Sequence, residues 1–232
     1  MYQSVFYNRL PGEDQWYYYL RDDKKGIHKF QYWPTLYKLD EYGEHETLFG
    51  EKCFPISGKY DRKDPTIYEK DIDRELVLLR DLYYKTDEMP EYHNTVYLDI
   101  EIEILGALTP FTIREANAEI TAIALIDTST KEKICFILDK AGKIEDINQD
   151  GKTIISCPDE NTLLRKFLLK WEQIDPTIVV GYNSDFFDIP YLFNRLVNVL
   201  GKQNAYRLSP IKDAFYSPYR KKWTFAGVSI LD

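Results

Sequence analysis

The chain has little of what several common kinds of site need. Its three cysteines lie far apart in 232 residues and form no CxxC pair, so a disulfide framework is not indicated and we expect reduced thiols. The three histidines show no spacing typical of metal ligands. No Gly-x-x-x-x-Gly-Lys-Ser/Thr loop is present, so ATP hydrolysis has no support.

Two further features are missing, a long apolar run and an excess of positive charge. No stretch reaches the roughly eighteen apolar residues that span a bilayer, and no signal peptide opens the chain. We therefore expect no membrane association and a cytoplasmic location. The formal net charge of −8 argues against a broad grip on duplex DNA, which needs clustered Lys and Arg. It is compatible with a nuclease whose own carboxylates are neutralised by metal ions.

What the chain does have is an acidic pair in the run TVYLDIEIEI. Apolar and polar residues alternate through this run with a period of two, which is typical of a half-buried strand. Asp99 and Glu101 therefore share one face, with Cα atoms roughly 7 Å apart, and their side chains can converge on one ion. Glu103 shares that face one step further on, where we expect solvent.

A second acidic motif follows in the segment VVGYNSDFFDIPY, where Asn183 lies in a turn and Asp188 opens a helix. Carboxylates from a strand and from a helix start suit a two-metal site for phosphodiester cleavage. Mg²⁺ prefers oxygen ligands, and two such ions can clamp the attacking and leaving oxygens. Taken singly, Asp188 would be an ordinary helix cap and the strand pair a solvated edge. The combination favours a nuclease.

The first 93 residues predict a small, mostly β module. Strand-like runs such as QWYYYL and IHKFQYW are joined by the polar turn DDKKG, and their aromatic residues predict cross-strand pairs and a core. Segment 71–84 places four apolar residues on one face of a closing helix, namely Ile72, Leu76, Leu79 and Tyr83.

From residue 94 to 232 the periodicity changes to an α/β pattern. Further strands are expected at about 118–127 and 132–138, then a helix that Asp159 caps and Asp175-Pro176 ends. The apolar run TIVVGY suits a buried parallel strand, and the helix that Asp188 opens ends at Gly201. This order predicts an α/β (α+β overall) chain whose second part is ribonuclease H-like, with a mixed sheet and flanking helices.

The two motifs also carry a family resemblance. LDIE, then NSDFFD and IPYLFNR, resembles the first and second exonuclease motifs of family B DNA polymerases, with the bacteriophage branch most similar. The resemblance covers residues 94–232 well and the first 90 loosely. It implies a proofreading 3′–5′ exonuclease, acting in the host cytoplasm if viral. Residues that match Asp99, Glu101 and Asp188 would bind two ions, Mg²⁺ or Mn²⁺, at the 3′ end of a single DNA strand.

Other positions receive roles in substrate binding. The resemblance implies that Asn183 contacts the strand or orders its loop, that Phe187 packs beneath the site, and that the segment 105–111 offers backbone contacts to the primer end. From the residues themselves, a basic run between aromatics in YSPYRKKWTF suits stacked single-stranded bases. That run is Arg220, Lys221 and Lys222.

The resemblance also implies that the complete site needs residues that are not in this sequence. A third motif, Tyr-x-x-x-Asp on a later helix, is expected roughly 100 residues after the second, and Asp232 is not a convincing substitute for it. We therefore expect the 232 residues alone to be impaired and the remainder of a polymerase, in the same or a second chain, to be a partner. Polymerase catalytic motifs are absent from this sequence, so it should not extend a primer by itself.

Two other functions remain open. The chain could be a non-catalytic module that binds nucleic acid or a partner protein, which unchanged binding after loss of the carboxylates would favour. It could instead be another ribonuclease H-like nuclease, which preference for RNA or internal cuts would favour.

Overall fold

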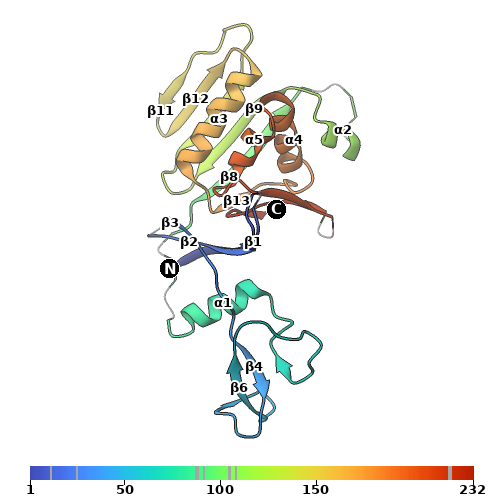
Figure 1. The fold of residues 1–232 in the computed structure, drawn as a ribbon. Coiled ribbons are helices and arrows are strands. Elements are labelled where there is room, and N and C mark those ends of the chain that lie inside the picture. The colour runs from blue at the N-terminus through green and yellow to red at the C-terminus, as the bar shows by residue number, and fades with distance from the viewer. Residues whose placement is uncertain are drawn as a thin grey trace. The chain divides into compact units, whose positions relative to one another are not determined.

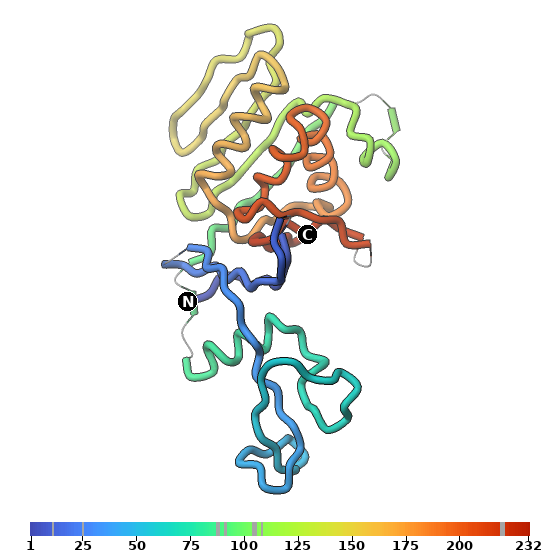
Figure 2. Tube along the Cα trace, viewed as in Figure 1, coloured from blue at the N-terminus to red at the C-terminus, as the bar shows by residue number. Residues whose placement is uncertain are grey.

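The chain forms two compact units, Met1–Glu91 and Tyr92–Asp232 (Figures 1 and 2). The computed structural model describes residues 1–10, 12–24, 26–86, 89–90, 92–103, 106–107, 109–218 and 221–232. The predicted boundary near residue 93 lies close to this division. That the two parts are separately folding domains stays a prediction.

The described residues of unit 1 form two antiparallel sheets and one helix. The first sheet pairs its strands in the order β1-β2-β3, and the second in the order β5-β6-β4-β7. Tyr18 and Leu20 on β2, together with Leu36 and Cys53, are buried, so the aromatic runs do build a core. The bounds are β1 Tyr2–Asn8, β2 Tyr17–Asp22, β3 Gly26–Phe30, β4 Leu36–Leu39, β5 His45–Glu46, β6 Lys52–Ile56 and β7 Ile67–Tyr68.

The helix of unit 1, α1 (Arg74–Tyr83), is shorter than the predicted 71–84 and buries a different face. Val77 and Leu78 are its buried residues, while Leu76 is 57% exposed and Ile72, 42% exposed, precedes the helix. The predicted apolar face was therefore wrong for Ile72 and Leu76, whereas Leu79 and Tyr83 are half-buried. Four apolar residues occur in a row at 76–79, so the sequence allows several faces and the packing partner selects one.

Unit 2 is built on a seven-stranded mixed sheet in the order β11-β12-β10-β9-β8-β13-β16 (Figure 1). The three strands at one end, β8, β13 and β16, are parallel to one another, whereas β9 runs antiparallel to both β8 and β10. The bounds are β8 Thr95–Ile102, β9 Ile120–Asp127, β10 Lys133–Leu138, β11 Ile147–Gln149, β12 Lys152–Cys157, β13 Ile178–Val180 and β16 Ser229–Leu231.

The alternation in TVYLDIEI determines which face of β8 is buried. Val96, Leu98 and Ile100 are at most 3% exposed and join the main core, while Asp99 and Glu101 are exposed on the opposite face. The register with β9 shifts between Glu101 and Ile102, so the strand becomes irregular directly after the acidic pair. Ile104, which the pattern also assigned to this strand, lies outside the described residues.

Two amphipathic helices pack on the sheet. In α3 (Glu160–Ile174) the N-cap Asp159 accepts a hydrogen bond from the Thr162 N–H at 2.8 Å, and the helix ends at Asp175 in a left-handed conformation. The second helix, α4 (Asp188–Leu200), ends at Gly201 with φ +85°, as the glycine predicted. Leu164, Phe167, Leu192 and other apolar side chains of these helices are completely buried with the strands in one core.

The mixed sheet with flanking helices confirms the predicted α/β fold class. Several smaller elements went unpredicted: the strand β11 beside β12, and the helices α2 (Pro110–Glu115), α5 (Lys202–Ala205) and η1 (Tyr206–Leu208). Across the residues that the structure describes, no helix is both long and apolar enough to cross a membrane. All three cysteines are free thiols.

Candidate active site

The strand half of the site is the outer face of β8, where Asp99 and Glu101 project away from the core. Their partners on β9 are small, because Asp99 pairs with Ala124 and Glu101 with Ala122. Small neighbours on the adjacent strand leave the two exposed carboxylates accessible from this face. The alternation of alanines in ITAIALID was visible in the sequence and could have predicted this open surface.

The helix half begins with the turn from Gly181 to Phe187, which leaves the end of β13. Asn183 has a left-handed backbone (φ 55°), and its carbonyl accepts hydrogen bonds from the Phe186 and Phe187 N–H groups. A Cβ atom on Gly181 would lie 2.6 Å from the Ser184 Cβ, so only glycine fits without a shift. The turn is therefore tightly folded against the end of its own strand.

Two contacts from distant residues hold this turn. The Asp232 Oδ1 atom accepts a hydrogen bond from the Ser184 N–H at 2.7 Å. The Lys222 Nζ lies 3.1 Å from the Asp185 Oδ2. Asp232 follows β16, the neighbour of β13, and Lys222 begins β15. The residues that hold this turn therefore come 37 to 48 residues after their partners in it. Neither contact was predicted from the sequence.

Asp188 joins the two halves. It is 3% exposed, and its Oδ1 accepts a hydrogen bond from the Ile100 N–H at 2.9 Å. Ile100 lies between Asp99 and Glu101, and β13 pairs with β8 only as far as Tyr97. The carboxylate thus satisfies a strand N–H that has no partner strand there. Burial, with the negative charges of Asp99 and Glu101 adding to it, raises the pKa of Asp188 to about 6.

The donor chemistry of these three carboxylates fits a hard divalent cation such as Mg²⁺ or Mn²⁺. Burial is the main cause of the raised pKa of Asp188, and the negative charges of Asp99 and Glu101 add to it. A cation at this point would offset these charges. In the described part of the chain, no three His, Cys, Asp or Glu side chains are already arranged to hold one ion.

A cavity of about 570 Å³ opens beside the end of β8. Its lining includes Ile102 and Glu103, directly after the acidic pair, and Tyr191, one helical turn after Asp188. Phe111 of α2 is 67% exposed and belongs to the same lining. A mostly apolar cavity next to carboxylates can accept a flat ring whose attached phosphate reaches the acidic group.

The motifs, the sheet and this geometry agree with a comparison of the sequence with known protein families. Residues 48–232 match the family described as DNA polymerase family B, exonuclease domain. The chain belongs to this family. The match begins inside unit 1, so the family extends beyond the sheet that carries the carboxylates.

Named relatives of this family B exonuclease chain come from viruses and from an animal. It is 26% identical to the DNA-directed DNA polymerase of Enterobacteria phage T4 over 249 aligned positions, which cover 90% of this chain and 27% of that protein. Identity to the Escherichia phage RB69 polymerase is 40% over 81 positions, 32% of this chain and 9% of that protein. For the Caenorhabditis elegans DNA polymerase delta catalytic subunit it is 29% over 131 positions, 52% of this chain and 12% of that protein. The chain thus spans about a quarter of the T4 polymerase.

The remaining predicted site residues of this family B chain lie around the turn. Phe187 is half-buried, with its ring 5.7 Å from that of Tyr191, whereas Phe186 is 63% exposed. Lys221 is exposed, and Lys222 is engaged with Asp185. Both belong to a two-stranded ribbon, β14 (Ala214–Ser217) and β15 (Lys222–Phe225), or to its connection. Arg220 and part of the segment 105–111 lie outside the described residues.

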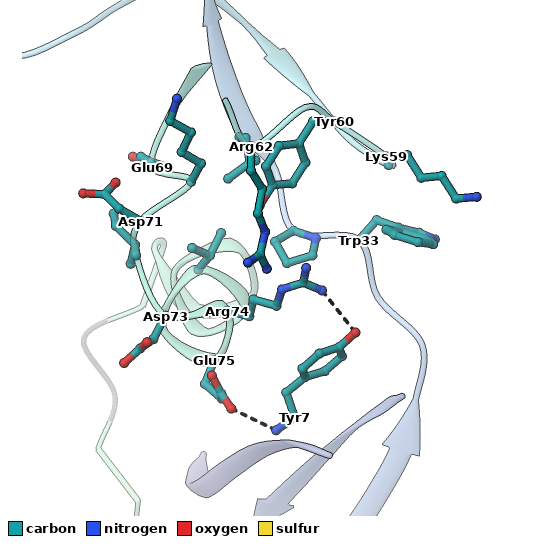
Figure 3. A pocket seen from close by; sticks show the side chains of 16 residues that line it. Tyr7, Trp33, Lys59, Tyr60, Arg62, Glu69, Asp71, Asp73, Arg74 and Glu75 are labelled. Atoms are coloured by element: carbon teal, nitrogen blue, oxygen red, sulfur yellow. Dashed lines mark hydrogen bonds between the residues drawn. The ribbon is translucent and has the colours of Figure 1, made fainter. Parts of the chain in front are cut away.

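Unit 1 of the family B chain has a pocket of its own, of about 530 Å³ (Figure 3). Figure 3 shows the guanidinium groups of Arg62 and Arg74 directed toward its middle, while the carboxylates of Asp71 and Asp73 point away. Arg74 donates a hydrogen bond to the Tyr7 hydroxyl at 3.1 Å. Both guanidinium groups lack a carboxylate partner among the residues described. That these two arginines line one pocket was not predicted, because α1 and the loop before β7 carry one each.

Proposed function

We propose that this chain carries a 3′–5′ exonuclease site that hydrolyses terminal nucleotides from the 3′ end of single-stranded DNA with two divalent ions, Mg²⁺ or Mn²⁺. The observation that carries the proposal is the hydrogen bond from the Ile100 N–H to Asp188. It ties the carboxylate of the second motif to the strand residue between Asp99 and Glu101. This contact supports a site to which both motifs contribute carboxylates.

Each carboxylate has a distinct part in the proposed reaction. Asp99 and Glu101 face solvent above small alanine neighbours, so an incoming phosphodiester can reach them. Asp188 is fixed to β8 and supplies negative charge from below. Divalent ions held by these groups would supply the positive charge that offsets charge on the phosphodiester and on the attacking and leaving oxygens.

The terminal nucleoside would occupy the cavity beside β8. Its apolar lining and the exposed ring of Phe111 suit a base, and its lining residues Ile102 and Glu103 follow Glu101 directly in the chain. Asn183 would order the turn through its left-handed backbone, and Phe187 would support it from below. The run Arg220, Lys221 and Lys222 would meet the strand further from its end, with Lys222 also neutralising Asp185.

We further propose that these residues work within a larger polymerase, which would be the partner of this chain. The chain spans 27% of the T4 enzyme, and the resemblance implies a third motif with a Tyr and an Asp. Without them a metal ligand and a partner for the attacking water are missing, so the 232 residues alone would cleave slowly.

The test is the shortening of a 5′-labelled single-stranded DNA oligonucleotide with Mg²⁺, with Mn²⁺ and with a chelator. The unmodified chain is compared with Asp99→Ala and with Glu145→Ala, an exposed acid in a loop away from the site. The same three proteins are also compared in a polypeptide that is extended by about 100 residues of the natural sequence. We expect a stepwise ladder that needs metal, is abolished by Asp99→Ala and survives Glu145→Ala.

The other outcomes are equally informative. Internal cuts, or preference for an RNA strand, would replace the proposal with another ribonuclease H-like nuclease. A ladder from the extended polypeptide alone would support the proposed need for a third motif. If neither polypeptide shortens the strand, the exonuclease proposal fails.

A second candidate, nucleic-acid binding without cleavage, is favoured by the pocket of unit 1. Arg62 and Arg74 offer two guanidinium groups to one anion, and a phosphate between them would relieve their mutual repulsion. Trp33, 57% exposed, and Tyr60 line the same pocket and can stack on a base. The arrangement suits a phosphorylated nucleoside within a single strand.

This candidate is tested by fluorescence anisotropy of labelled single-stranded DNA and RNA in the absence of divalent metal. Arg62→Ala and Trp33→Ala are compared with Lys63→Ala, an exposed cation in the same loop that does not line the pocket. We expect the first two to weaken binding at least fivefold and the control to change it less than twofold. Equal losses in all three would mean general charge attraction rather than a pocket.

A further inference from the structure

Helix α4 carries, besides Asp188, three side chains that hold one short backbone segment. The Tyr191 hydroxyl donates to the Ala118 carbonyl at 2.7 Å. Arg195 Nη1 donates to the Ala116 and Asn117 carbonyls, both at 3.0 Å. Asn198 Nδ2 donates to the carbonyls of Glu115 and Ala116 at 2.8 and 3.3 Å. Positions 191, 195 and 198 lie on one face of the helix, so four consecutive carbonyls are bound along it.

Arg195 is itself held by a buried acid. Glu160, at the start of α3, is 6% exposed and accepts bonds from Arg195 Nε at 2.8 Å and Nη2 at 2.6 Å. This bidentate contact raises the pKa of Arg195 above its ordinary value and fixes the plane of the guanidinium group. Glu160 also accepts from the Ile120 N–H at 2.7 Å. The segment is thus anchored both by α4 and by the acid behind it.

The held segment, residues 115–118, connects α2 to β9 and forms part of the cavity beside β8. Its turn requires a left-handed alanine, Ala116 with φ 45°, which is an unfavourable backbone for a residue with a Cβ. The hydrogen bonds to its carbonyls offset that cost. Helix α4 therefore carries Asp188 and, through its hydrogen bonds to residues 115–118, also holds the cavity wall.

We propose that Arg195, assisted by Tyr191 and Asn198, is a positioning residue that sets the distance between the carboxylates and the wall contacting the 3′-terminal nucleoside. This rests on the proposed exonuclease function. Arg195 does not itself line the cavity, but it holds the lining residue Asn117 through its backbone carbonyl. Its loss should therefore weaken the hold on the terminal base and leave the bond-breaking step nearly unchanged.

The test compares Arg195→Lys with Arg207→Lys in the longest natural polypeptide that carries this sequence. Lysine keeps a charge beside Glu160 but cannot bind two carbonyls and a carboxylate together. Arg207 forms a similar bidentate pair with Glu172 away from the cavity, so it is the matched control. The readouts are kcat and KM on single-stranded DNA with a normal or an abasic 3′ end, and amide exchange of residues 109–118.

For Arg195→Lys we expect faster amide exchange in 109–118, a KM raised about fivefold and kcat within about twofold, as for losing a hydrogen bond worth about 1 kcal/mol. With the abasic strand as substrate, the KM of Arg195→Lys should equal that of the unmodified protein, because no base is present to contact the wall. Arg207→Lys should change none of these. Unchanged exchange, a fall in kcat at constant KM, or an equal penalty on both ends would overturn the inference.

Failure of the exonuclease proposal gives a different result, because the unmodified protein then shortens no strand. In that case anisotropy with the normal and abasic strands replaces KM. A base-dependent loss of affinity in Arg195→Lys still supports the inference, and its absence overturns it.

Discussion

The two halves of the candidate site are built in opposite ways. Asp99 and Glu101 lie on a regular strand, exposed, with alternation alone deciding where they point. Asp188 lies behind an irregular turn, buried, and its environment is assembled from β8, β15 and the residue after β16. The strand half can change charge without disturbing the fold. In the turn half, charge, packing and stability are coupled, because a buried carboxylate costs free energy that neighbouring contacts must offset.

The largest expected effect is on the strand half. Asp99→Ala should reduce nucleotide release by about a thousandfold, since a carboxylate that holds metal ions is worth several kcal/mol of transition-state stabilisation. Unfolding in urea should change by less than about 0.5 kcal/mol, because the side chain is exposed. A marked loss of stability would mean that the strand half is coupled to the fold after all, and the contrast between the halves would disappear.

In the turn half, Asp188→Asn should change both the stability of the protein and its activity. The amide keeps an acceptor for the Ile100 N–H and removes a buried charge, so the metal-free protein should gain about 1–3 kcal/mol near pH 8 while losing cleavage. The folded pKa, about 6, lies above the ordinary 3.8. Stability of the unmodified protein therefore falls as pH rises from about 4 through about 6, and the gain should vanish near pH 4.

Packing at the turn can be tested through Gly181→Ala. The added Cβ would meet the Ser184 Cβ at 2.6 Å, so we expect a loss of about 1–3 kcal/mol in urea unfolding and weaker Mn²⁺ binding. The double change Gly181→Ala with Ser184→Gly removes the main clash and should recover part of the stability. If the double variant is less stable than the sum of the single ones, the clash is not the cause.

The smallest effect is expected at Asp232. Asp232→Ala removes the acceptor of the Ser184 N–H and should cost about 1 kcal/mol, whereas Asp232→Asn keeps an acceptor and should cost less. Both are made in a polypeptide that continues beyond residue 232, and exchange of the Ser184 amide is followed by NMR. Equal exchange in all three proteins would show that the contact does not hold the turn.

Prediction from the sequence succeeded where local pattern and tertiary packing agree. The β8 alternation, the Asp159 cap, the stop at Asp175 and the glycine after α4 each depend on residues within a few positions of one another. It failed for α1, where four consecutive apolar residues fit more than one face. The network around Arg195 was not predicted, because its acceptors are backbone carbonyls, which every sequence contains.

The sequence by itself determined the family, the fold class and the face on which Asp99 and Glu101 lie, because side-chain alternation and capping are local. Only the tertiary structure decided that Asp188 is buried against the Ile100 N–H, that Asp232 and Lys222 hold the turn, and that α4 carries a cavity wall. These features depend on which distant segments meet. Burial and hydrogen-bond geometry arise from contacts between distant segments, so no short stretch of residues can predict them.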